Sequence, residues 1–102
     1  MKLDFNIPLK DLDQNEVIEN GKPLMIGKVL GNLFCQDAHK DSPFTAMDAL
    51  EIAMKLNRGE AIDLEKKESE YLKGWIEKHG TINIILKAPL LKVFEFSALK
   101  KK

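Results

Sequence analysis

Hydrophobic and polar positions alternate at the start of the chain. Every second residue from Leu3 to Leu9 is apolar, which is the two-residue period of a strand with one buried face. Pro8 lacks a backbone N–H group, so this strand should be short or lie at the edge of a sheet. Further along, the pair Asn20-Gly21 suits the positive φ angles of a tight turn. We therefore predict a short β-hairpin or meander over about residues 2–19.

The period changes to that of a helix after Pro23. Five apolar residues between Ile26 and Phe34 fall at positions i, i+3, i+4, i+7 and i+8, and this spacing forms one stripe on a helix. A first helix is therefore expected over about residues 23–35.

A second helix is expected over about residues 43–57. Ser42-Pro43 is a good N-cap followed by proline at the first helical position, and Gly59 can end the helix. The residues predicted to face inward are Phe44, Met47, Leu50, Ala53 and Met54.

The second half of the chain predicts further helices. Asp63 can cap a third helix over about residues 64–79. The segment after it is almost entirely apolar, and we favour a fourth helix over about residues 82–98, kinked or restarted at Pro89. A strand over residues 81–86 followed by a helix over residues 89–98 is the alternative. The predicted fold class is α+β, with three to four helices packed on the N-terminal hairpin.

Length and composition indicate one domain. A chain of 102 residues can form one hydrophobic core and is too short for two. No linker or repeat divides it, so we expect a single compact domain over residues 1–102. The one cysteine, Cys35, cannot form an intrachain disulfide. No stretch approaches about 18 consecutive apolar residues, and the N-terminus does not resemble a secretory signal. We expect a soluble, cytoplasmic protein with no membrane association.

The charges balance overall but are unevenly distributed. The chain holds 16 Lys/Arg and 16 Asp/Glu, so no overall field attracts nucleic acid or an anionic membrane. Residues 1–63 hold 7 Lys/Arg and 11 Asp/Glu, a net of −4, whereas residues 64–102 hold 9 and 5, a net of +4. Such polarity could orient a partner or a second copy of the chain, and plain solvation of the surface is the other interpretation.

Few residues suggest chemistry. Asp11-x-Asp13-x-Asn15 begins like a calcium loop, but Glu16 and Lys22 stand where such a loop needs glycine and a bidentate glutamate. We expect an Asx turn there instead.

The pair Cys35 and His39 is spaced for one helix face but supplies only two of the ligands that zinc needs. We expect Cys35 to be a small core residue and the histidines to sit at helix ends. No nucleophile elbow or phosphate-binding glycine loop occurs. We predict no catalytic, metal-binding or cofactor-binding residues and no enzyme activity, and a small metal-dependent enzyme using Cys35 and His39 is kept as an alternative.

Contact surfaces are the remaining functional candidates. Glycine inside a helix costs about 1 kcal/mol relative to alanine, so Gly27 and Gly31 should be offset by a closely packed neighbour. The candidate interface residues are Gly27, Gly31, Tyr71, Trp75, Phe94 and Phe96. Core packing is the alternative for each of them, and the neighbour of the glycines would then be the hairpin or the C-terminal helix.

The layout resembles a group of small proteins encoded by tailed bacteriophages and prophages. The resemblance rests on Leu9 to Asp13, Gly21 to Leu24, Leu30 to Leu33 and Gly59 to Leu64, followed by a helix to Lys78. The chain departs from that pattern at residues 86–92, where an acidic and apolar helix is expected. The resemblance implies a phage origin and no particular mechanism.

These observations predict a non-catalytic phage-type protein that acts through protein–protein contacts. It would serve as a virion assembly factor or structural accessory, or as a modulator of a host protein, and it would be cytoplasmic in the host cell or virion-associated. Its partner would be a phage or host protein or a second copy of itself. A regulatory or anti-defence protein is the alternative within the same class.

Overall fold

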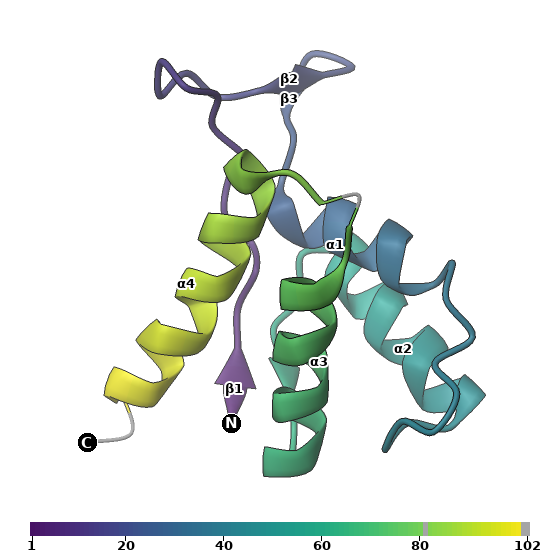
Figure 1. The fold of residues 1–102 in the computed structure, drawn as a ribbon. Coiled ribbons are helices and arrows are strands. Elements are labelled where there is room, and N and C mark those ends of the chain that lie inside the picture. Colours follow the sequence, from purple (N-terminus) through teal and green to yellow (C-terminus); the bar gives the residue numbers. More distant parts are fainter. Residues whose placement is uncertain (81, 101–102) are drawn as a thin grey trace.

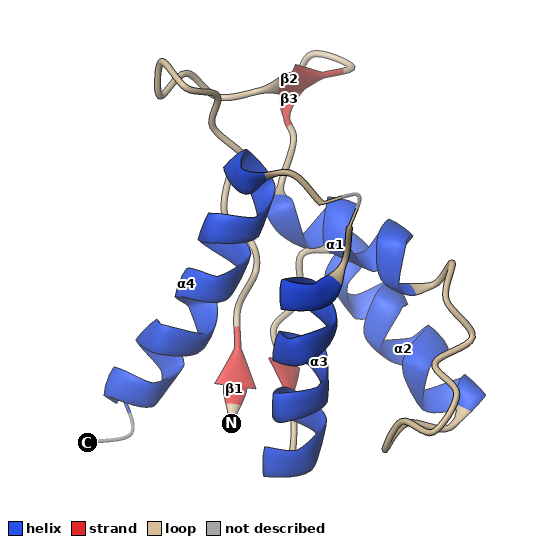
Figure 2. Ribbon diagram, viewed as in Figure 1, coloured by secondary structure: helices blue, strands red, loops and turns tan. Residues whose placement is uncertain are grey.

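The computed structural model describes residues 1–80 and 82–100, with side chains as far as residue 95. The described residues form four helices, one N-terminal hairpin and a second small antiparallel sheet (Figures 1 and 2). The helices are α1 (Ile26–Phe34), α2 (Ala46–Asn57), α3 (Lys66–Lys78) and α4 (Ile84–Lys100). The predicted α+β class is confirmed.

The hairpin turns at the residues that the sequence indicated. Strands β2 (Ile18–Glu19) and β3 (Lys22–Pro23) pair antiparallel. Between them Asn20 and Gly21 have φ angles of 53° and 78°, the left-handed values that the turn requires.

The first strand has a partner that the sequence pattern did not indicate. β1 (Lys2–Leu3) pairs antiparallel with β4 (Ile62–Asp63), with Leu3 opposite Ile62. Both of these side chains are buried, and the N-terminal ammonium donates to the carbonyl of Leu64 over 2.8 Å. The N-terminal segment therefore has two partners. Its first residues pair with β4, and residues 8–10 join the hairpin through antiparallel bridges from Lys10 to Glu16 and from Pro8 to Met25, as the predicted meander required.

Two helices begin later than predicted because other residues cap them. Thr45 caps α2 by accepting from the N–H of Asp48 over 3.1 Å. The Ser42 hydroxyl instead accepts from the N–H of Phe44 in the preceding turn. Glu65 and Glu68 form a capping box at the start of α3. Asp63, the predicted cap, lies in β4 instead.

The C-terminal segment forms one helix that runs through Pro89. Residues 84–86 are helical and residues 82–83 are not in a strand, so the helix that we favoured is present and the alternative strand is not; residue 81 lies outside the described residues. The helix neither starts nor ends at Pro89, which lies within it.

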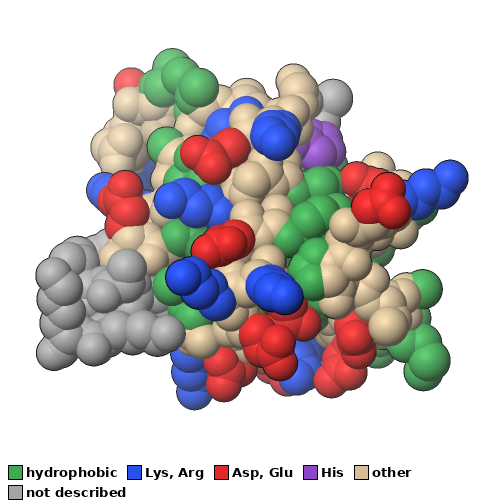
Figure 3. Space-filling model, turned by 60° about the horizontal axis from the view of Figure 1, so that its bottom comes forward, with side chains coloured by type: hydrophobic (Ala, Val, Ile, Leu, Met, Phe, Trp, Pro, Cys, Tyr) green, Lys and Arg blue, Asp and Glu red, His purple; other side chains and the backbone are tan. Residues whose placement is uncertain are grey.

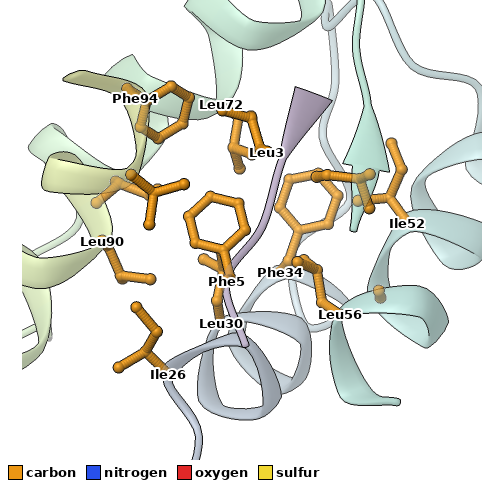
Figure 4. Packing of buried hydrophobic residues seen from close by; sticks show 14 of the residues in the cluster. Leu3, Phe5, Ile26, Leu30, Phe34, Ile52, Leu56, Leu72, Leu90 and Phe94 are labelled. Atoms are coloured by element: carbon orange, nitrogen blue, oxygen red, sulfur yellow. The ribbon is translucent and has the colours of Figure 1, made fainter. Parts of the chain in front are cut away.

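The core joins the N-terminal segment to all four helices. Figure 4 shows the Phe5 ring with side chains of α4 on one side and those of α1 and α2 on the other. Its ring centroid is 5.9 Å from that of Phe94 in an edge-to-face arrangement, a favoured geometry for aromatic pairs. No helix of the described residues has the length and apolar character needed to cross a membrane.

Candidate interaction surfaces

The glycine face of α1 is an internal contact. Gly27 and Gly31 are both buried. A Cβ atom on Gly31 would lie 2.7 Å from the carbonyl oxygen of Ala53 in α2, and one on Gly27 would lie 3.0 Å from the carbonyl oxygen of Phe5. The close neighbours are thus the N-terminal segment, as expected, and α2 in place of the C-terminal helix. These two glycines belong to the core and are unavailable to a partner.

α2 carries apolar residues on two faces. Its buried face consists of Ala49, Ile52, Ala53 and Leu56. Met47, Leu50 and Met54 point away from that face, with 82%, 56% and 47% of their surface exposed. Their spacing of three and four residues places them in one stripe. We call these three residues the α2 ridge.

The predicted inward face of α2 was therefore wrong at Met47, Leu50 and Met54, although Phe44 and Ala53 are buried as expected. The glycines of α1 lie against the backbone of α2 at Ala53 and Leu56, and this close approach fixes which face of α2 is buried. The long Met and Leu side chains consequently lie outside.

A second apolar surface lies where residues 7–14 meet the first half of α4. This groove has a volume of about 680 Å³ and is open to solvent. Its apolar lining consists of Ile7, Pro8, Leu12, Ile84, Ile85, Ala88 and Pro89, and its charged lining consists of Lys10, Asp11, Lys92 and Glu95. Ile84 and Leu12 are 77% and 83% exposed. We call this feature the α4 groove. Ile7 was expected to be buried with its strand neighbours, but the chain bends at Ile7, whose N–H donates to the carbonyl of Phe5.

Tyr71 and Trp75 lie together in an aromatic cluster beside the loop between α1 and α2. His39 from that loop is buried, with its ring centroid 3.9 Å from that of Phe34. The carbonyl of Phe34 can only accept, so His39 Nε2–H donates to it over 2.6 Å. In the neutral ring Nδ1 then accepts from the Tyr71 hydroxyl over 2.8 Å. The cluster fastens the loop to α3.

Asp37 provides a second link between this loop and α3. Its carboxylate accepts from the indole N–H of Trp75 over 2.7 Å and from the backbone N–H of His39 over 3.1 Å. These two hydrogen bonds hold the pKa of Asp37 below its ordinary value. Burial raises the pKa of the Tyr71 hydroxyl, and the nearby Asp37 carboxylate adds to that effect.

The cluster has the geometry of a structural hydrogen-bond network rather than of a catalytic site. Both ring nitrogens of His39 and the Tyr71 hydroxyl already have partners. A shallow hollow of about 470 Å³ borders Tyr71, Trp75 and Gly74, so both aromatic residues keep a partly exposed side. Every buried polar side-chain atom in the described part of the chain has a hydrogen-bond partner, which is the usual condition of a structural network.

Cys35 and His39 differ from expectation, whereas His79 lies at the C-terminal end of α3 as expected. Cys35 is exposed rather than in the core, and His39 is buried within a loop rather than at a helix end. In that loop His39 has a left-handed φ of 52°. Among the described residues no three His, Cys, Asp or Glu side chains are grouped so that they could hold a metal ion.

The polar turn near the N-terminus is an Asx turn, as predicted. The Asp11 carboxylate accepts from the N–H groups of Asp13 and Asn15 over 2.9 and 3.0 Å. Its oxygen is thus used to close the turn.

The two candidate phenylalanines have different positions. Phe94 is buried against Phe5 and Leu90 in the core (Figure 4). The side chain of Phe96 lies outside the described residues. Of the six candidate interface residues, Tyr71 and Trp75 are the ones that the structure brings together near the surface.

Figure 3 shows one face of the molecule, on which Lys/Arg and Asp/Glu side chains intermix and hydrophobic side chains come to the surface between and beside them. Six of the seven large hydrophobic side chains that are exposed among the described residues lie in the α2 ridge or the α4 groove. The seventh is Ile18 in the hairpin.

Comparison with known proteins gives no match: no family model, no curated protein and no solved structure is significantly similar to this chain.

Proposed function

We propose that the chain is a non-catalytic protein that acts through protein–protein contacts, as an assembly factor or structural accessory of a phage virion or as a modulator of a host protein. The phage assignment rests on the sequence resemblance, and the mode of action rests on the exposed apolar surface.

The α2 ridge is the observation that carries this proposal. A helix of a small domain normally turns its apolar stripe toward the core and presents polar residues to water. α2 has a complete buried face and a second apolar stripe on its exposed side. Exposed apolar groups at i, i+3 and i+7 are the pattern by which a helix anchors in a partner's groove.

The polar groups support a non-catalytic role. The buried histidine and the tyrosine beside it are fully engaged with each other and with the backbone. The Cys35 thiol donates to the carbonyl of Asn32 in α1 over 3.2 Å, whereas a nucleophile needs a general base within hydrogen-bond reach.

Affinity capture with matched variants tests the proposal. Tagged protein is exposed to an extract of phage-producing cells, and the retained proteins are quantified for the wild type, Leu50→Gln and Ile18→Gln. Leu50 lies in the α2 ridge, whereas Ile18 is an equally exposed apolar residue on the hairpin. We expect a protein, or the chain itself, to be retained by the wild type and Ile18→Gln and lost with Leu50→Gln. Identical retention by all three would contradict a role for the ridge.

A further inference from the structure

One glycine of α3 is not explained by packing. Gly74 lies inside the helix, where only proline is less favourable than glycine. A Cβ atom there would meet nothing within 4 Å, in contrast to the close backbone contacts of Gly27 and Gly31. Gly74 instead lines the hollow of about 470 Å³ beside the aromatic cluster. The missing side chain therefore keeps this hollow open and does not serve the approach of another element.

Two aromatic residues line the hollow next to this glycine. Tyr71 and Trp75 are about one helical turn apart in α3. The Tyr71 hydroxyl is engaged with His39, and the Trp75 indole N–H is engaged with Asp37. Because these polar groups are occupied, the two residues offer their rings to the hollow. An aromatic ring attracts a cation placed over its face through its quadrupole.

The charges at the hollow also favour a cation. Asp37 and Glu70 supply two carboxylates and Lys78 supplies one ammonium group, a net of −1 at pH 7 with histidine neutral. The Asp37 carboxylate acts on the aromatic wall, since it contributes to the raised pKa of the Tyr71 hydroxyl. Glu70 directly precedes Tyr71, whereas Lys78 follows about two helical turns later. Negative charge therefore adjoins the Tyr71 end of the hollow.

We propose that this hollow binds a small organic cation of the quaternary ammonium type. Such a group carries a positive charge but has no N–H donor, so it needs aromatic and carboxylate neighbours rather than unoccupied hydrogen-bond acceptors. The volume of about 470 Å³ lies within the range of about 300–1,000 Å³ that is typical of small-molecule sites. The site is formed by α3 and the loop before α2, so it is independent of the α2 ridge and of the function proposed for that ridge.

Titration with tetramethylammonium chloride tests the proposal, because Trp75 lines the hollow and is the single tryptophan of the chain. We expect a saturable change in its fluorescence with half-saturation on the order of 1 mM, as for a small ligand in an open site. Sodium chloride at the same ionic strength should cause no such change. The uncharged tert-butanol, which has a similar shape, should bind at least about tenfold more weakly, because it lacks the attraction of a cation to the rings and carboxylates.

Substitutions at the two ends of the hollow should have opposite effects. At low salt, where surface charges are least screened, Glu70→Gln should weaken binding about threefold and Lys78→Gln should strengthen it by a similar factor. Glu77→Gln is the control, because Glu77 is exposed on α3 but does not line the hollow. It should change the affinity less than either of the other substitutions.

A side chain at Gly74 should block the site. Gly74→Leu should abolish the fluorescence response and keep the fold, because its Cβ atom would meet no other atom within 4 Å. Lys73→Leu is the matched control, since Lys73 is exposed at the neighbouring position outside the hollow, and it should retain binding. Circular dichroism checks the fold of both variants.

Four results would overturn the proposal. Equal binding of tert-butanol and tetramethylammonium would show that the hollow does not prefer a cation. A wild type without a saturable response, or a folded Gly74→Leu that binds as the wild type does, would exclude binding at this place. Tighter binding by Glu70→Gln together with weaker binding by Lys78→Gln would contradict the charge preference, and this pair decides the matter even where Gly74→Leu does not fold.

Discussion

Individual residues in the loop between α1 and α2 depend on hydrogen bonds that no sequence period shows. His39 has a left-handed backbone and a buried ring, and Asp37 reaches Trp75 in α3 across 38 positions. The sequence identified Tyr71 and Trp75 as a region of interest, but hydrophobic spacing carries no information on polar partners so far apart in the chain. The nearest signal was the chemistry of the two residues themselves, because aspartate is common in turns and histidine is enriched at positive φ angles.

The Asp37–Trp75 hydrogen bond makes a prediction for acid stability. The pKa of Asp37 is lower in the folded chain than in the unfolded chain, so the unfolded state binds the proton first as the pH falls. The stabilisation is present above the unfolded pKa of about 3.9 and is lost as the pH falls through the lower folded pKa. The free energies of unfolding of the wild type and Asp37→Asn should differ at pH values above the unfolded pKa and converge at pH values below the folded pKa.

Urea unfolding followed by fluorescence provides the measurement, since Trp75 is the single tryptophan of the chain. Asp13→Asn is a suitable control, because Asp13 lies in the N-terminal Asx turn and is not among the causes of the lowered pKa of Asp37. A difference between wild type and Asp37→Asn that grows as the pH falls below the ordinary range for aspartate would contradict the account.

At the scale of elements, the sequence predicted the number of helices better than their faces. The glycine turn, the stop at Gly59 and the helical character of residues 84–98 followed from local chemistry. The face of α2 did not, because apolar residues occupy both sides of the helix and the larger ones dominate the pattern. Gly27 and Gly31 held part of the signal, because their missing side chains let the backbone of α2 approach at Ala53 and Leu56, and this contact fixes the buried face of α2.

The close contact of α1 with α2 predicts opposite effects of glycine substitution in two helices. Gly31→Ala should lower the free energy of unfolding by about 1–3 kcal/mol, because its Cβ would meet backbone atoms of α2. Gly74→Ala in α3 should raise it by up to about 1 kcal/mol, because nothing lies within 4 Å of the added atom and alanine is the better helix former. Denaturant unfolding measures both. Equal effects of the two substitutions would mean that the α1–α2 contact is looser than described.

At the scale of the whole molecule, the sequence indicated electrical polarity and one domain, and the structure places the acidic α2 and the basic α4 at different sides (Figure 1). The groove could not be predicted, because it joins segments that are at least 70 positions apart and that only the fold brings together.

The most direct measurement is affinity capture by the wild-type chain, Leu50→Gln and Ile18→Gln, because it tests whether the exposed α2 ridge holds a partner. We expect the wild type and Ile18→Gln to retain the same protein and Leu50→Gln to lose it, since Leu50 and Ile18 are equally exposed but only Leu50 lies in the ridge. Equal retention by all three would contradict the proposal that the chain acts through the α2 ridge.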